Sequence, residues 1–289
     1  MKLGIFITTH LNKGYRHGSK MESELFDFFC DKTIKSHIDY KVGIDNTIYI
    51  CDTGSTDERY LNWVNNTLPS NIVKIDIPNH DGAWAAMKYI MHDNKSIINN
   101  FDYMLFQVDD DGCFPQKDNW ATDLIEYYNK DTKTGIMGRL LDSIKLGKNG
   151  LVDHRNCAPQ IAKIWGIKED TIIPHLHGNW YFMSSKILKL LSNIWYEPFY
   201  SVEDMNYQKK YENEDFCTLA KFPDRRKTLD NVHIGREIDL PLRIDKLGFQ
   251  CTSYKGISVY PNAIQPYSHW KNPKVPVKGF YGEYIYENK

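Results

Sequence analysis

The chain has 289 residues, enough to bury a sizeable hydrophobic core, and its formal net charge is only −1. This near balance argues against a protein that binds nucleic acid or an anionic membrane surface through bulk positive charge. The six cysteines form no CxxC pair, which argues against a structural zinc site and a dense disulfide framework.

No apolar segment reaches the roughly 18–20 residues of a membrane span. The first apolar run, at residues 3–7, is too short for the core of a signal peptide. We therefore expect a soluble protein of a reducing compartment, the cytoplasm, whether its gene is cellular or is carried by a virus and expressed in the host cytoplasm. The sequence does not indicate an oligomeric state.

The first third of the chain alternates short apolar runs with helical patterns. The expected strands cover residues 3–9, 47–51, 72–77 and 104–108, and the expected helices cover residues 22–38, 57–66 and 83–92. This alternation predicts an α/β fold with a mostly parallel central sheet flanked by helices. The second half is less regular, and residues 205–230 are expected to be rich in loops.

Polar residues lie at or just after the end of each expected strand. They are Thr8 and Thr9, Asp52, Asn79, and the three carboxylates Asp109, Asp110 and Asp111. Parallel α/β sheets bind their ligands at the carboxyl ends of the strands. The sequence therefore predicts a ligand site at this edge.

The three consecutive carboxylates follow a buried strand and repel one another, so a positive group is expected beside them. Oxygen ligands favour hard cations such as Mg²⁺ or Mn²⁺, which keep coordination positions open for substrate phosphates. Asp109 and Asp111 are two residues apart, so in extended backbone they point to the same side. The alternative is a solvated acidic turn.

A second polar string, CDTGSTD at residues 51–57, follows the second expected strand. Asp52 could accept a hydrogen bond from a nucleotide base. Gly54 allows a tight turn, and a helix after it could be capped by Ser55, Thr56 or Asp57. Ordinary turn and cap chemistry explains the same string, and the two interpretations are both open.

The order of these elements resembles the nucleotide-sugar-binding half of GT-A glycosyltransferases, particularly the large family 2 type. The resemblance covers residues 3–115 and consists of a strand, DTGSTD, a strand, N-x-x-G, a helix, a strand and DDD. It implies a single Rossmann-like GT-A domain over residues 1–289, with a donor half to about residue 115 and an acceptor half after it. It also implies contacts to the donor base and ribose from Thr8, Thr9 and Asp52, with Asn79 at the same edge.

The same resemblance implies a metal site. Asp109 and Asp111 would be the D-x-D pair that holds Mn²⁺ or Mg²⁺ on the donor diphosphate, with Asp110 between them. His269 could supply a further metal or diphosphate contact, as a C-terminal histidine does in many GT-A enzymes. A purely structural role for His269 is the alternative.

Residues 175–185 resemble the family's glycine-containing segment under the acceptor site. Gly178 permits close backbone approach, and Trp180 or Tyr181 could stack on a sugar face. An ordinary core strand with aromatic packing is the alternative.

Residues 235–249 resemble the family segment that carries the catalytic base. Glu237 falls at the position of the base, although Arg236 replaces the acid that usually precedes it. Asp239 and Asp204 are competing candidates, the latter in one of two acidic pairs (203–204 and 214–215). The alternative is an amphipathic helix with a solvated acidic first turn.

Together these features predict a glycosyltransferase that moves a sugar from a nucleoside-diphosphate sugar, UDP favoured, to a hydroxyl of a glycan acceptor. An inverting mechanism with a carboxylate base is preferred. A retaining transferase on the same fold and a catalytically silent glycan-binding module are the alternatives. A sugar-phosphate nucleotidylyltransferase fits poorly, because residues 8–16 do not match its phosphate loop.

Overall fold

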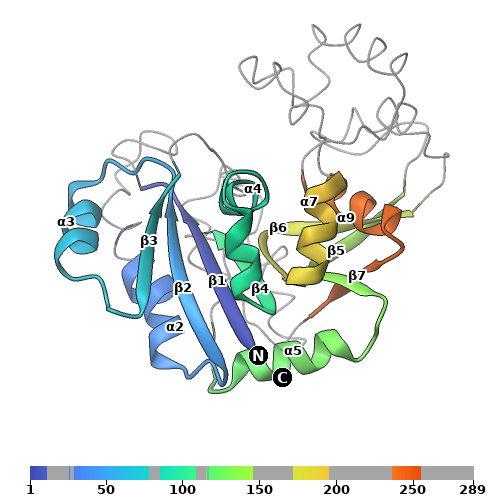
Figure 1. The fold of residues 1–289 in the computed structure, drawn as a ribbon, viewed down its shortest axis with the longest axis horizontal. Coiled ribbons are helices and arrows are strands. Elements are labelled where there is room, and N and C mark those ends of the chain that lie inside the picture. Colours follow the sequence, from blue (N-terminus) through green and yellow to red (C-terminus); the bar gives the residue numbers. More distant parts are fainter. Residues whose placement is uncertain are drawn as a thin grey trace, which may run out of the picture. The chain divides into compact units, whose positions relative to one another are not determined.

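A computed structural model describes residues 1–11, 26, 29–77, 85–108, 115, 117–145, 172–194 and 236–254. Their strands form a sheet of order β3-β2-β1-β4-β6-β5-β7 (Figure 1). The chain forms two compact units. Unit 1 comprises residues 1–139, 179–189 and 253–289, and unit 2 comprises residues 140–178 and 190–252. The expectation of one domain over the whole chain stays a prediction.

Four parallel strands form the centre of unit 1. They are β1 (Lys2–Thr9), β2 (Asp45–Asp52), β3 (Ile72–Asp76) and β4 (Tyr103–Val108). β1 pairs in parallel with β2 and β4, and β2 pairs in parallel with β3. The predicted α/β class, with a mostly parallel sheet flanked by helices, is confirmed, and each predicted strand agrees with the observed one within two residues.

The register aligns the carboxyl ends of these strands. Thr9 is opposite Asp52, and Asp52 is opposite Asp76. On the other side of β1, Thr8 is opposite Val108, the last residue of β4. The polar residues that end separate strands in the sequence therefore form one row across the sheet.

The helices of unit 1 only partly match their sequence patterns. α3 (Glu58–Asn66) and α4 (Ala85–His92) agree with the prediction, whereas α5 (Trp120–Asn129) was not predicted. The single helix expected at residues 22–38 is, over residues 29–39, a π-helix η1 (Phe29–Ile34) followed by α2 (Lys35–Asp39). Apolar spacing does not reveal the i→i+5 bonding of a π-helix. A 3₁₀ helix, η2 (Lys95–Asn100), precedes β4.

The start of α3 follows from a local side-chain contact. Asp57 precedes the helix, and its Oδ1 accepts a hydrogen bond from the backbone N–H of Tyr60 at 3.0 Å. This contact satisfies one of the N–H groups that a helix leaves without a partner at its start. Of the three capping candidates, the structure therefore selects Asp57.

The core of unit 1 lies around β1, which is buried from Leu3 to Thr9. A strand buried on both faces reads as a continuous apolar run, which is why the sequence predicted it well. Burying each large aliphatic side chain contributes about 1.5–3 kcal/mol. The core cluster includes Leu3, Ile5, Ile7, Ile48, Ile50, Leu105, Leu124 and Trp180.

β6 (Ile172–Ser184) is antiparallel to β4, with Gln107 opposite Trp180 and Tyr103 opposite Ser184. It leads directly into α7 (Ser185–Ile194). The Ser185 hydroxyl donates to the Phe101 carbonyl oxygen at 2.6 Å and so ties the start of α7 to the segment before β4.

In unit 2, α9 (Arg236–Lys246) docks on the end of α7 through a buried arginine. Arg243 is 2% exposed, and its Nη1 donates to the carbonyl oxygen of Ile194, the last residue of α7, at 2.7 Å. A cation is favourable at a helix carboxyl end. β5 (Thr134–Lys145) and β7 (Gln250–Ser253) are the two remaining strands of the described sheet.

Across the described ranges, every helix is too short or too polar to cross a bilayer.

Candidate functional site

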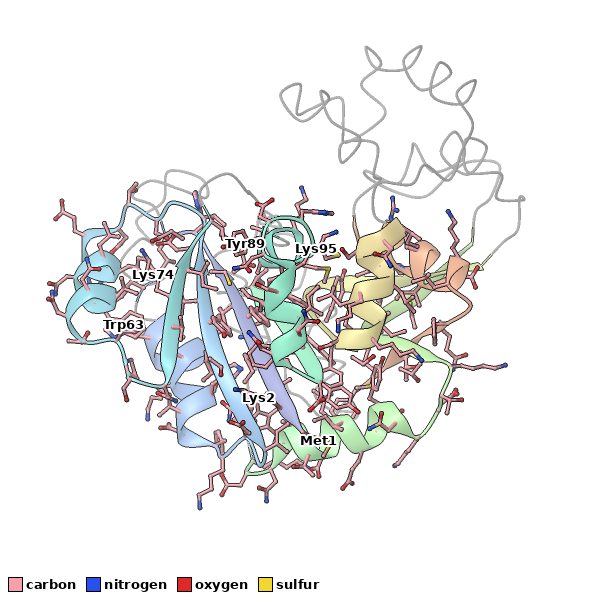
Figure 2. All side chains as sticks on the ribbon, viewed as in Figure 1. Met1, Lys2, Trp63, Lys74, Tyr89 and Lys95 are labelled. Carbon is pink, nitrogen blue, oxygen red and sulfur yellow. The ribbon has the colours of Figure 1, made fainter. Side chains whose placement is uncertain are left out.

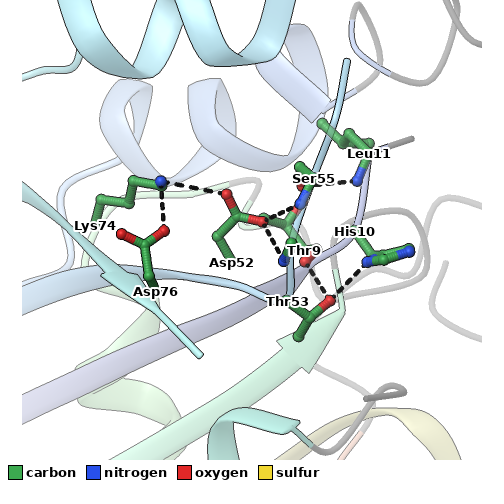
Figure 3. A network of polar contacts seen from close by, with 9 residues as sticks. Thr9, His10, Leu11, Asp52, Thr53, Ser55, Lys74 and Asp76 are labelled. Carbon is green, nitrogen blue, oxygen red and sulfur yellow. Dashed lines mark hydrogen bonds and ion pairs between the residues drawn. The ribbon is translucent and has the colours of Figure 1, made fainter. Parts of the chain in front are cut away.

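The loops after β1 and β2 are joined at the carboxyl edge of the sheet (Figure 3). Thr53 donates to the Thr9 carbonyl oxygen from both its backbone N–H and its hydroxyl, each at 3.0 Å. The Leu11 N–H donates to the Ser55 hydroxyl at 2.9 Å, and the Leu11 carbonyl accepts from the N–H of Asp57 at 2.8 Å. The two loops therefore hold each other in place.

Asp52 organises the turn after β2. Its Oδ1 accepts hydrogen bonds from the N–H groups of Gly54 at 3.1 Å and Ser55 at 2.8 Å, and the residue is 3% exposed. Gly54 has φ +96°, a conformation that glycine adopts without strain. The turn chemistry that the sequence left as an alternative is thus present around Asp52.

The other oxygen of Asp52 faces a lysine that the sequence analysis missed. Lys74 extends from β3 (Figure 2), and its Nζ lies 3.4 Å from Asp52 Oδ2 and 2.5 Å from Asp76 Oδ1. Burial acts to lower the pKa of Lys74, but the hydrogen bond to Asp76 and the charges of both carboxylates raise it overall. Lys74 therefore stays protonated. Lys74 precedes Asp76 by two residues, so the two side chains lie on the same side of the strand. This spacing was the sequence signal from which the Lys74–Asp76 pair could have been predicted.

The hydrogen bonds of Thr53 determine the tautomer of His10. His10 Nδ1 lies 2.9 Å from Thr53 Oγ1. Because the Thr53 hydroxyl donates its proton to the Thr9 carbonyl, its oxygen must accept here, and His10 Nδ1 must donate. The proton of a neutral His10 is therefore on Nδ1, and its Nε2 is an acceptor.

The two predicted threonines are part of this framework. Thr9 is 1% exposed and Thr8 is 6% exposed. The Thr8 hydroxyl accepts a long hydrogen bond of 3.4 Å from the N–H of Ala86, in the first turn of α4. Thr8 thereby links the end of β1 to the helix that follows β3.

The predicted metal and base residues lie mostly beyond the described ranges. β4 ends at Val108, and the acidic run begins at the next residue. Outside the described residues are Asp109, Asp110, Asp111, Asn79, Asp204 and His269. Within the ranges that the structure describes, no group of three or more His, Cys, Asp or Glu side chains could hold a metal ion.

The predicted acceptor and base residues fall on β6 and α9. Trp180 and Tyr181 are 1% and 0% exposed, which favours the alternative of an ordinary core strand. Gly178 lies in β6, in unit 2. Glu237 and Asp239 lie at the start of α9, and the placement of their side chains is not described.

Similarity to known proteins is found among solved structures and not among family models or curated sequences. No family model matches the chain, and no curated protein matches its sequence. Among solved structures, the chain is similar to the mannosyltransferase PcManGT from Pyrobaculum calidifontis in complex with GDP-Man and Mn²⁺. The TM-score is 0.42 at 11% sequence identity, over 87% of this chain and 54% of the other. The chain thus spans about half the length of that protein.

Proposed function

We propose that the chain is a metal-dependent glycosyltransferase that moves a sugar from a nucleoside-diphosphate sugar, with UDP favoured, to a hydroxyl of a glycan acceptor. The observation that supports this is the register of the parallel strands. Thr9, Asp52 and Asp76 lie in one row, and Val108, opposite Thr8, immediately precedes the acidic run. The motifs that resemble the GT-A donor site thus start from one sheet edge, where ligands of such sheets bind.

In this proposal the donor lies along that edge. Thr8, Thr9, Asp52 and Asn79 form the base and ribose end. Asp109 and Asp111, with His269 as a further ligand, would hold Mn²⁺ or Mg²⁺ at the diphosphate end, beside Asp110. The metal would stabilise the negative charge on the departing nucleoside diphosphate.

The acceptor half would supply the catalytic base. Glu237 is the proposed base that takes the proton from the acceptor hydroxyl, with Asp239 and Asp204 as the competing candidates. Gly178, Trp180 and Tyr181 belong to the proposed acceptor segment, although the burial of the two aromatic side chains favours a supporting role for them. The configuration of the product anomeric carbon, read by NMR, separates the inverting mechanism from the retaining one.

A thermal-shift screen tests the donor class. Ligand that binds only the folded state raises the apparent stability by RT ln(1 + [L]/Kd). We expect UDP-sugars to stabilise the protein in the presence of Mn²⁺, ahead of GDP- and dTDP-sugars. Asp109→Asn and Asp111→Asn should abolish this stabilisation, whereas Asp45→Asn, at the opposite end of the sheet, should not. Stabilisation that needs no metal would contradict the D-x-D site, and no stabilisation by any donor would contradict the function.

A further inference from the structure

We propose that the protein forms a two-fold dimer through the edge of its sheet, in which β3 pairs antiparallel with β3 of a second copy. The two-fold axis passes beside Ile75. Three features of β3 support this pairing: its position in the sheet, the direction of its backbone groups and the order of its charged residues. The inference does not depend on the proposed function.

β3 is an outer strand of the described sheet (Figure 1). Within the described residues it pairs with β2 alone. An edge strand presents a row of N–H and C=O groups on which another strand can pair, and many proteins block such an edge with protruding charged side chains. The directions of the backbone groups and of the charged side chains therefore decide whether this edge can pair.

The backbone groups of Lys74 and Asp76 face outward. The Ile77 N–H donates to the Asp52 carbonyl oxygen of β2 at 2.8 Å, so the N–H and C=O groups of Ile77 face β2. Successive residues of a strand direct these groups to opposite sides. By this alternation Ile75 also faces β2, whereas Lys74 and Asp76 direct their N–H and C=O groups away from it.

Lys74 does not block this edge. Its ammonium group lies between Asp52 and Asp76 (Figure 3), 3.4 Å from Asp52 Oδ2 and 2.5 Å from Asp76 Oδ1. The Lys74 side chain is only 23% exposed, whereas that of Asp76 is 71% exposed. The lysine is thus held against its own sheet, and the Asp76 carboxylate is accessible to a second copy.

The charges of β3 select one register. A two-fold pair centred on Lys74 or on Asp76 places like charges directly opposite each other, which is destabilising. A pair centred on Val73 gives neither charged residue an opposite charge. A pair centred on Ile75 places Lys74 of each copy opposite Asp76 of the other. In this register the outward backbone groups of both residues also meet as hydrogen-bonded pairs.

The other side of β3 adds apolar contact. Val73 and Ile75 point to the side opposite Lys74 and Asp76. Val73 is 43% exposed and Ile75 is half-buried. In the selected register Ile75 lies opposite its own counterpart, so the same surface is used by both copies, as a two-fold interface requires. One short strand pair makes a small interface, so we expect a weak, reversible dimer.

This dimer would leave the two candidate sites independent. Antiparallel pairing about a two-fold axis joins the two sheets and directs their carboxyl ends to opposite edges of the combined sheet. The row of Thr9, Asp52 and Asp76 in one copy and the same row in the other therefore open in opposite directions.

Sedimentation velocity of the full chain tests the proposal over protein concentrations from about 1 µM to about 500 µM, the range of weak interfaces. The wild-type protein should show a dimer fraction that rises with concentration. Asp76→Lys places two lysines opposite each other, and Lys74→Glu places two acids opposite each other. Each variant alone should dimerise about 10-fold more weakly or less. A mixture of the two restores opposite charges at both positions and should dimerise again.

Two further variants separate the edge from general effects of charge. Asp76→Pro removes an N–H that faces away from β2, so the ladder to β2 is retained while the outward pairing is lost. This variant should stay folded and become monomeric. Asp45→Lys is the matched control, because Asp45 is also 71% exposed but begins the inner strand β2. It should leave the dimer fraction unchanged.

The outcomes are decisive even if the Lys74→Glu variant does not fold. A wild-type protein that stays monomeric over the whole concentration range would overturn the proposal. A dimer that persists equally in Asp76→Lys and Asp76→Pro would place the interface elsewhere and would also overturn it. Loss of the dimer in these two variants, with the dimer retained in Asp45→Lys, would support pairing through β3.

Discussion

Gly43 lies so close to Asn119 that a Cβ on Gly43 would stand 2.8 Å from the Asn119 Cα atom. This contact is part of a junction in which the loop after α2 closes the start of α5. The N–H groups of Asn119 and Ala121 donate to the carbonyl oxygens of Lys41 at 2.7 Å and Val42 at 3.2 Å. The loop thereby satisfies backbone groups that α5 leaves without a helical partner.

Replacing Gly43 with alanine should destabilise the protein. Gly43 has φ +90°, and the added methyl group would meet both Asn119 and the Thr122 hydroxyl. We expect a loss of about 1–3 kcal/mol in the free energy of unfolding, measured in urea. Gly248→Ala is the control, because Gly248 also has a positive φ, +80°, but an added Cβ there would meet no atom within 4 Å. An equal loss in the two variants would contradict a role for the close contact.

His37 should make stability depend on pH. The ring is 3% exposed, its Nδ1 donates to the Thr33 carbonyl at 2.7 Å, and it packs edge-on against Trp120. Burial lowers the pKa of His37 from 6.5 to about 4, outweighing the hydrogen bond to Thr33. Between these two pKa values the unfolded chain therefore binds more protons than the folded protein. The contribution of neutral His37 to the free energy of unfolding is complete above pH 6.5 and is lost as the pH falls towards 4.

The corresponding experiment compares wild type with His37→Gln, which takes up no proton. The wild-type protein should lose about 2 kcal/mol more than the variant between pH 7 and pH 5. Urea unfolding at pH 7, 6 and 5 measures this difference. A gap between the two proteins that stays constant over this range would show that His37 is not buried in its neutral form.

Thr53 should contribute to stability through its hydroxyl, which donates to the Thr9 carbonyl and accepts from His10 Nδ1. Thr53→Val keeps the shape of the side chain and removes both contacts, so we expect a loss of about 1–3 kcal/mol. Thr53→Ser retains the hydroxyl and should lose less. Urea unfolding of the three proteins gives the comparison, and equal losses for valine and serine would mean that the hydroxyl contributes little.

Glu237 should be required for turnover but not for donor binding. General-base catalysis contributes about 10²–10⁴-fold, so Glu237→Gln should lower kcat by that factor while the Kd for the donor is unchanged. Asp239→Asn and Asp204→Asn test the competing assignments, and Glu126→Gln, on the exposed face of α5, is the control. Full activity in Glu237→Gln would show that another residue is the base.

The sequence predicted those elements whose cause is local. β1 is a continuous apolar run, and α3 begins at a capping aspartate, so both are readable from a few neighbouring residues. The unpredicted α5 follows directly after Asn119, which has a left-handed backbone and whose N–H is bound by the distant Lys41 carbonyl oxygen. The π-helix η1 was missed because a one-residue change in helical period leaves no clear apolar signature.

The candidate site shows the same division. Asp52 and its turn were visible in the string at residues 51–57, because a turn is a local structure. Lys74 was not, because its partner Asp52 is on another strand and their meeting depends on the β2–β3 register. Trp180 and Tyr181 could be read as sugar-stacking or as core, and only their burial favoured the core.

The sequence by itself determined the α/β class and which residue types end each parallel strand, since strand and turn preferences act over a few residues. Tertiary structure alone decided which of those residues meet. Strand register brought Thr9, Asp52 and Asp76 into one row, and it placed the Lys74 ammonium between two carboxylates. The physical reason is that hydrogen-bonded pairing between strands fixes contacts between residues that are far apart in the chain.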